Sequence, residues 1–112
     1  MKRDYKVYIS DMVESILNIR KYVEGITCDQ FAEDRKTQDA VIRNFEILGE
    51  AVKHIPTEFK KKYSEIPWKT IAGLRDKVIH EYFGVELSIV WKTIEQRLPE
   101  LLVSLQKILK EI

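Results

Sequence analysis

Apolar side chains recur every three or four residues along most of this chain, which is the period of an amphipathic helix. One stripe runs from Tyr5 to Val23, a second from Val41 to Ile55, and a third from Leu101 to Ile112. No stretch of useful length alternates apolar and polar residues, as a half-buried strand would. The pattern therefore predicts an all-α protein.

Cap residues and breakers divide these stripes into helices joined by short linkers. Gly25 is expected to end the first helix, and the run Thr27-Cys28-Asp29-Gln30 matches a capping box that begins a short helix through about Asp34. Thr37 is expected to cap the second long helix, and Pro56 to end it. Because short linkers favour antiparallel neighbours, we expect a compact antiparallel helical bundle.

The second half of the chain divides less sharply. A short accessory helix is predicted from Thr57 to Tyr63, and a longer helix from near Pro67 to an apolar break at Phe83-Gly84. The region from about Glu86 to Ile112 is also expected to be helical, and Pro99 either kinks it or begins a new helix.

Size and charge limit what the chain can do. Its 112 residues are the length of one domain, which we place at residues 1–112, and a chain this small is a natural candidate for stabilisation by a partner subunit. The formal net charge is only +1, so any binding to nucleic acid depends on a local basic patch and not on the overall charge.

The cellular compartment is suggested by what the sequence lacks. The chain carries one cysteine, Cys28, so no disulfide can form within it, which fits a reducing compartment. No apolar run approaches the roughly 18 residues that a membrane-spanning helix requires. The basic start of the chain is not followed by the apolar segment of a secretory signal peptide. We therefore expect a cytoplasmic protein with no membrane partner.

Residues 75–82 concentrate more reactive groups than any other part of the chain. Arg75 supplies a permanent cation, His80 an imidazole that titrates near neutral pH, and Tyr82 a phenol. Cleavage of RNA by its own 2′-hydroxyl needs one proton removed, one proton returned and a stabiliser for negative charge on the phosphate. Histidine and arginine meet these needs without a metal or another cofactor, and no cluster in the sequence has the spacing of metal ligands.

Spacing along a helix separates these groups. At about 100° per residue, Arg75 and Tyr82 share a face about two turns apart, whereas Arg75 and His80 point about 140° away from each other. One small substrate cannot meet both Arg75 and His80 from one straight helix. Either the helix ends before His80, or a second copy of the chain completes the site.

Basic residues gather between residues 53 and 77, where seven lysines or arginines stand against three acids. The candidate patch for an RNA backbone consists of Lys60, Lys61, Lys62 and Lys77. A solvated helix face explains the same run nearly as well, and an RNA patch of this kind predicts modest, salt-sensitive binding. His54 has no partner at ligand spacing and is interpreted as a residue that interacts with the dipole at the end of its helix.

The reactive run and its surroundings resemble a known family. Arg75, His80 and Tyr82 form the Arg-x4-His-x-Tyr signature of HepT-like toxins, a branch of the HEPN ribonucleases. Four further segments are similar to that family and stand in the family's order, so that the resemblance spans roughly Asp4 to Leu109. These segments are Lys36–Asn44, Ile47–Ala51, Ile66–Trp68 and Tyr82–Val85.

The resemblance implies a HEPN-like up-down bundle and a metal-independent endoribonuclease toxin, with Arg75 and His80 as its catalytic residues. Proteins of this family dimerise with two motifs facing each other across a two-fold axis, which implies a homodimer acting on RNA. Asn44 and Glu50 lie on a helix that packs near the site in the family, so they are expected to support it. Asp76 stands where many relatives carry Asn, and its carboxylate is expected to orient Arg75 or His80.

The resemblance also implies a regulator. In HepT/MntA-type toxin–antitoxin systems, a minimal nucleotidyltransferase antitoxin transfers AMP to the tyrosine that matches Tyr82. The added phosphate places negative charge beside the site, where it repels RNA and occupies Arg75. Glu81 stands where many relatives carry Gly, and it adds negative charge of its own.

Two other functions stay open. Many small helical HEPN domains hold a nucleotide or a nucleotidyltransferase partner without cutting RNA, and Arg75 and His80 would then grip a nucleotide phosphate. The charges of Asp76 and Glu81 keep this alternative open. A third interpretation is a plain helical interaction protein, against which the intact pair of Arg75 and His80 argues.

Overall fold

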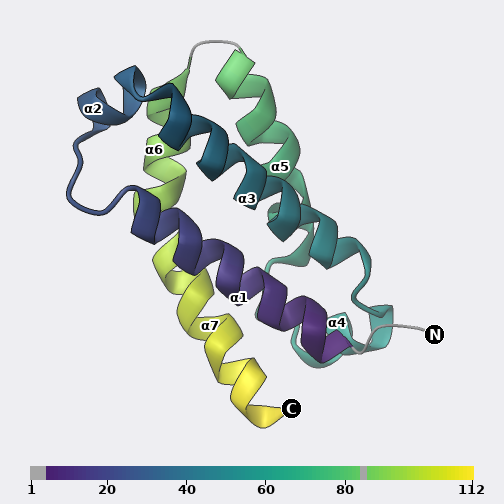
Figure 1. The fold of residues 1–112 in the computed structure, drawn as a ribbon. Helices are drawn as coiled ribbons and strands as arrows, with labels where there is room; N and C mark the ends of the chain where they lie inside the picture. The colour runs from purple at the N-terminus through teal and green to yellow at the C-terminus, as the bar shows by residue number, and fades with distance from the viewer. Residues whose placement is uncertain (1–4, 84–85) are drawn as a thin grey trace.

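The computed structural model describes residues 5–83 and 86–112, except for the side chains of residues 79–83. This part of the chain contains seven helices and no strand, so the prediction of an all-α protein is confirmed (Figure 1). The helices are α1 (Tyr5–Tyr22), α2 (Cys28–Glu33), α3 (Arg35–Lys53), α4 (Thr57–Lys62), α5 (Trp68–Phe83), α6 (Leu87–Gln96) and α7 (Leu98–Glu111). None of these described helices is long and apolar enough to cross a membrane.

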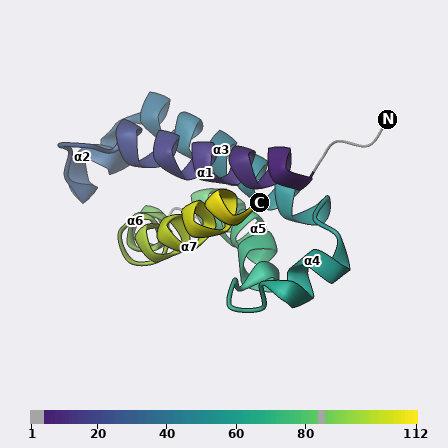
Figure 2. The same cartoon turned by 90° about the horizontal axis from the view of Figure 1, so that it is seen from below.

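The helices form two layers. α1 and α3 lie side by side and antiparallel, and α5 packs along α3 and runs antiparallel to it (Figure 1). Seen from below, α1 and α3 form one layer, while α4 to α7 form the other (Figure 2). α7 packs against α1, and α6 packs against both α5 and α7, which closes the bundle. The predicted antiparallel bundle is therefore confirmed.

The apolar stripes of the sequence meet in one core between these layers. Most of the largest fully buried side chains come from α1 and α3 on one side and from α5 and α7 on the other. They include Ile9, Met12, Ile16, Ile19, Phe45, Leu48, Ile71, Leu98, Leu105 and Ile108. Removal of this apolar surface from water is the main force that holds the helices together, so it also fixes the relative positions of α1, α3 and α5.

Side-chain caps set the boundaries of α2 and α3. The predicted capping box is present: the Gln30 N–H donates to Thr27 Oγ1 at 3.1 Å, and the Thr27 N–H donates to Gln30 Oε1 at 2.9 Å. The prediction that Thr37 caps α3 is wrong. Asp34 caps this helix, because its Oδ1 accepts a hydrogen bond from the Thr37 N–H at 3.1 Å, and α3 begins at Arg35.

Glycine and proline mark the other boundaries. Gly25 lies in the turn after α1 with a φ of +77°, in the left-handed region that glycine enters freely. Pro56 separates α3 from α4. The last predicted helical region divides at Arg97 into α6 and α7. Pro99 lies in the first turn of α7, so it belongs to the start of a new helix and not to a kink.

Candidate active site

α5, which carries Arg75, is anchored at its first residue. Trp68 is buried, and its indole Nε1 donates to the backbone carbonyl oxygens of Lys60 and Tyr63 at 3.2 and 3.1 Å. Apolar side chains then turn into the core every three or four residues, as predicted. These are Ile71, Leu74 and Val78. The helix therefore has one fixed rotation about its axis, which decides where Arg75 points.

Arg75 lies where α5 packs tightly against α3. Its side-chain stem faces Gly49, and a Cβ built on this glycine would lie 2.7 Å from Arg75 Cβ. The side chain keeps 36% of its surface exposed, and its Nη1 donates a hydrogen bond to Asp76 Oδ1 at 2.8 Å. Asp76 thus contacts Arg75, one of the two residues that it was expected to orient. The Arg75 side chain is therefore held at its aliphatic stem by α3 and at its guanidinium by Asp76, and the guanidinium still reaches solvent.

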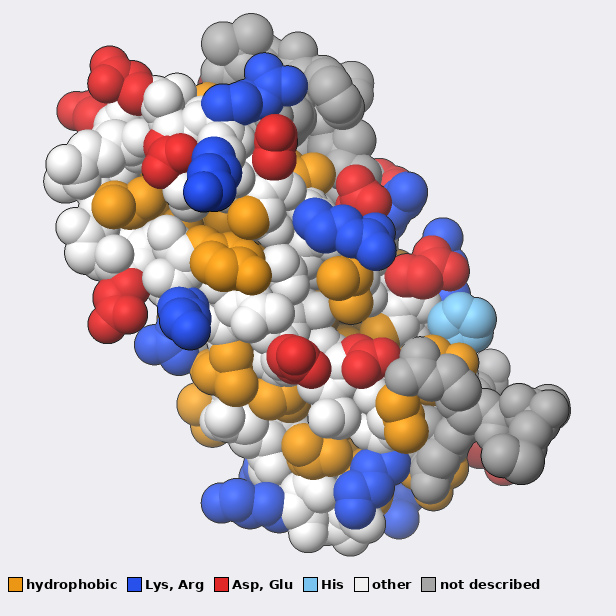
Figure 3. Space-filling view, viewed as in Figure 1, with side chains coloured by type: hydrophobic (Ala, Val, Ile, Leu, Met, Phe, Trp, Pro, Cys, Tyr) orange, Lys and Arg blue, Asp and Glu red, His pale blue; other side chains and the backbone are white. Residues whose placement is uncertain are grey.

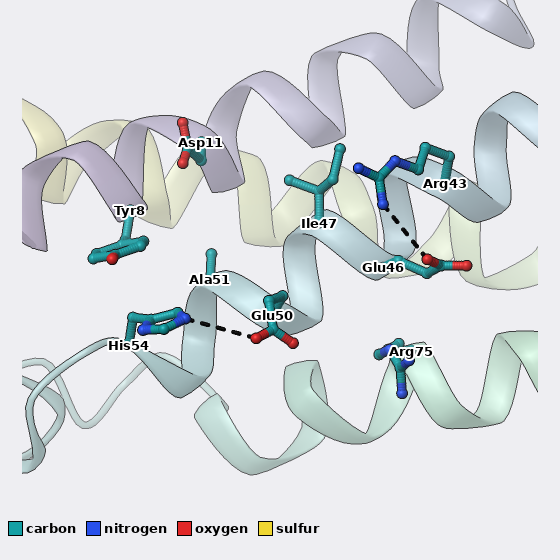
Figure 4. Close-up of a pocket in the computed structure, with 9 residues that line it drawn as sticks. All are labelled: Tyr8, Asp11, Arg43, Glu46, Ile47, Glu50, Ala51, His54 and Arg75. Carbon is teal, nitrogen blue, oxygen red and sulfur yellow. Dashed lines mark ion pairs between the residues drawn. The ribbon is translucent and has the colours of Figure 1, made fainter. Parts of the chain in front are cut away.

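A pocket of about 430 Å³ opens beside Arg75 between α1, α3 and α5 (Figure 4). Arg75 lies at one end of this pocket, and Tyr8 and His54 lie at the other. Its lining consists of Tyr8, Asp11, Arg43, Glu46, Ile47, Glu50, Ala51, His54 and Arg75. Pockets of this volume hold small molecules, and one nucleotide is of suitable size.

Charges of both signs line the pocket. Arg43 pairs with Glu46 at 3.6 Å, and Glu50 lies 3.6 Å from His54 Nε2 (Figure 4). Glu50 also lies 3.6 Å from Lys53 Nζ. Arg43 and Glu50, which share a face of α3, therefore pair with nearer neighbours and not with each other. Exposed ion pairs of this kind add little to stability, so a bound ligand can exchange with them at small cost. In the described part of the chain, no three His, Cys, Asp or Glu side chains are arranged to hold a metal ion.

His54 caps the C-terminus of α3, as its interpretation as a helix-end residue requires, but it also lines the pocket. Its ring stacks on Tyr8, with centroids 4.8 Å apart and ring planes 9° from parallel. Sequence reasoning missed this contact because the two residues come from α1 and α3 and meet only when these helices pack. No local pattern in the sequence signals the stack.

α5 is helical through Phe83. The first alternative for the motif, a helix that ends before His80, is therefore wrong. On a continuous helix the directions of residues 75 and 80 differ by about 140°. The predictions that concern the side chains of His80, Glu81 and Tyr82 lie outside the described residues.

The sequence profile of HepT-like ribonucleases matches residues 12–108. The chain belongs to the HepT-like ribonuclease family. The resemblance seen in the sequence is thereby confirmed, and with it the class of enzyme, a ribonuclease.

Relatives cover the chain over its full length. A probable ribonuclease HepT of Thermococcus cleftensis is 46% identical over 98% of this chain and 100% of its own length. A provisionally named RNase of Methanocaldococcus jannaschii is 40% identical over 99% of this chain and 92% of that protein. Another, from Caldanaerobacter subterraneus, is 43% identical over 93% of each chain. No solved structure gives a significant match.

Of the two supporting residues predicted on α3, Glu50 lines the pocket of this HepT-like ribonuclease and Asn44 does not. Asn44 is buried against α1. Its Nδ2 donates to the Ala40 carbonyl oxygen at 2.9 Å, and its Oδ1 accepts from Asn18 Nδ2 at 3.3 Å. Asn44 therefore ties α3 to α1, and its connection to the pocket between them is indirect.

The predicted basic patch lies in two places on the HepT-like fold. Lys60, Lys61 and Lys62 end α4 near the N-terminus of α5, whereas Lys77 lies two residues beyond Arg75. About 13 Å of helix axis separates the start of α5 from Lys77. The face of the molecule in Figure 3 mixes basic and acidic side chains without a continuous basic field. Lys77 is thus closer to Arg75 along α5 than the other three, but on this helix it points about 160° away from Arg75, so the four lysines do not form one patch beside it.

Proposed function

We propose that this HepT-like ribonuclease is a metal-independent endoribonuclease toxin in which Arg75 and His80 carry the chemistry. The placement of Arg75 is the observation that supports this most directly. A cation held between α3 and Asp76, at the end of a pocket of nucleotide size, is suited to grip a phosphate through two oxygens. The pocket then receives the nucleotide next to the scissile phosphate, with Glu50 among its lining groups.

The reaction follows from these two groups. His80 takes the proton from the 2′-hydroxyl or returns a proton to the leaving 5′-oxygen. The 2′-oxygen bonds to phosphorus as the bond from phosphorus to the 5′-oxygen breaks, which leaves a 2′,3′-cyclic phosphate and a 5′-hydroxyl. Arg75 stabilises the negative charge that gathers on the non-bridging oxygens, and loss of one such donor costs about 10²–10³-fold in rate.

A homodimer resolves the geometry of α5. Because this helix continues through Phe83, residues 75 and 80 of one chain diverge by about 140° and cannot meet at one phosphate. We infer that each site takes Arg75 from one chain and His80 from the partner subunit, across a two-fold axis. A second chain also adds buried surface to a small domain, which favours the same assembly.

Regulation is proposed at Tyr82. A minimal nucleotidyltransferase antitoxin would transfer AMP from ATP to the tyrosine hydroxyl, forming a phosphodiester and releasing pyrophosphate. Residue 82 follows Arg75 by about two turns of α5, so the new negative charge would lie within reach of the guanidinium. The phosphate of the added AMP would repel the RNA backbone, and it would pair with Arg75 in place of the RNA phosphate.

A second candidate is a module that binds a nucleotide, or a nucleotidyltransferase, without cutting RNA. The ion pair between Arg75 and Asp76 at 2.8 Å keeps this candidate open, because the nearby carboxylate offsets part of the positive charge that Arg75 would offer to the transition state of cleavage. An RNA phosphate must then displace or share this contact. Binding without cleavage would need Arg75 for the phosphate but would make no use of a proton transfer at His80.

RNA cleavage in the presence of EDTA separates the two candidates. The wild-type protein should convert an unstructured RNA to fragments with cyclic phosphate ends. Arg75→Ala and His80→Ala should each lower the rate by about 10²-fold or more, with helicity and light-scattering mass unchanged. Cleavage that appears only on addition of Mg²⁺ would refute the proton-transfer scheme. No cleavage at all, together with ATP binding that Arg75→Ala abolishes, would establish the binding module.

A further inference from the structure

Gly49 is an unusual residue for its place. It lies in the last third of the long helix α3, where glycine weakens a helix relative to alanine because it loses more backbone freedom on folding. The residue is also buried, so no solvent-facing role accounts for it. Glycine at such a position is explained by a neighbouring group that fills the space where a side chain would lie.

That neighbour is Arg75. A Cβ on residue 49 would lie 2.7 Å from Arg75 Cβ, 3.4 Å from its Cδ and 3.5 Å from its Cγ. Carbon atoms in contact prefer about 3.5–4.0 Å, so α3 and α5 would have to separate by roughly 1 Å at this point. The closest atom is the Cβ, which is fixed to the backbone, so a rotation of the arginine side chain cannot relieve the contact.

The surrounding core gives little room for local adjustment. Leu48 and Val52 are buried beside Gly49 on α3, and Leu74 and Val78 are buried beside Arg75 on α5. Because interiors are close-packed, a shift of one helix against the other moves the whole segment. The displacement therefore reaches the arginine and the adjoining end of the pocket.

We propose that Gly49 is a positioning residue for RNA cleavage, whose missing side chain lets α5 approach α3 closely enough to set Arg75 at the pocket. This inference rests on the proposed function of Arg75. Catalytic groups must be held within about 0.5 Å of their productive place, and a misplacement of about 1 Å can cost about 10²-fold in rate. Gly49 thus acts through Arg75 and has no contact of its own with RNA.

Gly73 offers a matched control on α5 itself. It lies two residues before Arg75, it is exposed, and a Cβ built on it meets nothing within 4 Å. Gly73→Ala therefore makes the same chemical change as Gly49→Ala in a helix of the same site, without the contact. It should raise the melting temperature slightly, because alanine favours the helix, and leave cleavage unchanged.

The experiment compares kcat and KM for a fluorogenic RNA in EDTA, using the full chain and the variants Gly49→Ala, Gly73→Ala and Arg75→Ala. Gly49→Ala should lower kcat by about 10²-fold with KM changed by less than about threefold, because Arg75 acts on charge that develops in the transition state. Its light-scattering mass should equal that of wild type. A loss of fold alone would lower the active fraction of Gly49→Ala in step with its helicity.

A double variant keeps the test decisive if Gly49→Ala folds poorly. Arg75→Gly removes the Cβ that residue 49 would meet, so the combined variant Gly49→Ala with Arg75→Gly should lose less melting temperature than the two single changes added together. Additive losses would show that the contact is not the cause, and would overturn the proposal. The combined variant should not cleave RNA, since it lacks the arginine.

The failures of the two proposals are distinct. If Arg75→Ala cleaves like wild type, the proposed catalytic role of Arg75 is wrong, and so is the positioning role of Gly49 that rests on it. If Arg75→Ala is inactive while Gly49→Ala keeps kcat within about threefold of wild type, the role of Arg75 stands and the positioning role of Gly49 is wrong. Equal losses in Gly49→Ala and Gly73→Ala would also overturn it.

Discussion

Tyr82 follows Arg75 by seven residues, which on an ideal helix is about two turns along one face. Tyr82→Phe keeps the ring and removes only the hydroxyl that would accept AMP. Cells that express this variant should stay poisoned when the nucleotidyltransferase is co-expressed, whereas cells with the wild-type chain should recover. Growth curves and intact-mass spectra of both purified proteins check this, with the wild type alone gaining AMP. Equal rescue of both would mean that the antitoxin inhibits by binding alone.

The candidate residues Arg75, His80 and Tyr82 could be named from the sequence because they lie within one short segment, and their roles stay predictions. Their surroundings could not. Gly49 meets the Arg75 side chain, and His54 lines the same pocket as Arg75, only through the packing of α1, α3 and α5. Nothing in the sequence near either residue indicates these contacts. Spacing along the sequence shows which groups share a helix face. Which other helix packs against that face depends on how the buried side chains of the core fit together.

At the scale of single elements, the cap of α3 makes stability depend on pH. Hydrogen bonds from the Thr37 side chain and backbone lower the pKa of the Asp34 carboxyl below its ordinary value. A carboxyl with a lower pKa in the folded state stabilises the fold above its unfolded pKa of about 3.9, and this contribution is lost as the pH falls through the folded value.

Asp34→Ala should therefore lower the melting temperature by a few degrees at pH 7, and the difference from wild type should shrink below about pH 4. Asp34→Asn is the matched control, because asparagine keeps a cap acceptor but carries no charge. Its melting temperature at pH 7 should lie between those of Asp34→Ala and wild type. Thermal melts by circular dichroism across this pH range measure both, and a constant difference at every pH would contradict the cap's role.

The same cap shows where prediction of elements from sequence stops. The long helices could be foreseen from their apolar period and α2 from its capping box, because both signals lie in neighbouring residues. The start of α3 could not, because Asp34 and Thr37 are both good caps and stand three residues apart. The structure uses both, with Asp34 as the acceptor and the Thr37 hydroxyl donating to Asp34 Oδ2 at 2.6 Å. The sequence likewise did not show whether Pro99 kinks one long helix or begins a second, and the structure divides this region at Arg97.

For the whole molecule, a site shared between two chains predicts complementation. Arg75→Ala and His80→Ala are each expected to be inactive alone. When the two variants are unfolded together and refolded, mixed dimers should form, each with one complete site and one empty site. Cleavage should return to roughly a quarter of the wild-type rate per chain, because about half of the dimers are mixed. A rate assay against mixing ratio, with light scattering, measures this.

The control for complementation is a mixture of Arg75→Ala with Arg75→Lys/His80→Ala, in which no site holds both wild-type residues. It should stay well below the first mixture. A strictly monomeric mass at tens of micromolar, or no recovery in mixed dimers, would rule out a site assembled from two chains.

Because α5 continues through Phe83, the proposed activity should depend steeply on the concentration of the chain. On a continuous helix residues 75 and 80 point about 140° apart, so in the proposed dimer a complete site would form only when two chains meet. While pairs are scarce, their number rises with the square of the chain concentration, by mass action. Halving synthesis of the chain then removes about three quarters of the sites. If the chain acts as the proposed toxin, a cell would tolerate slow leakage of it and would still be stopped by a burst of synthesis.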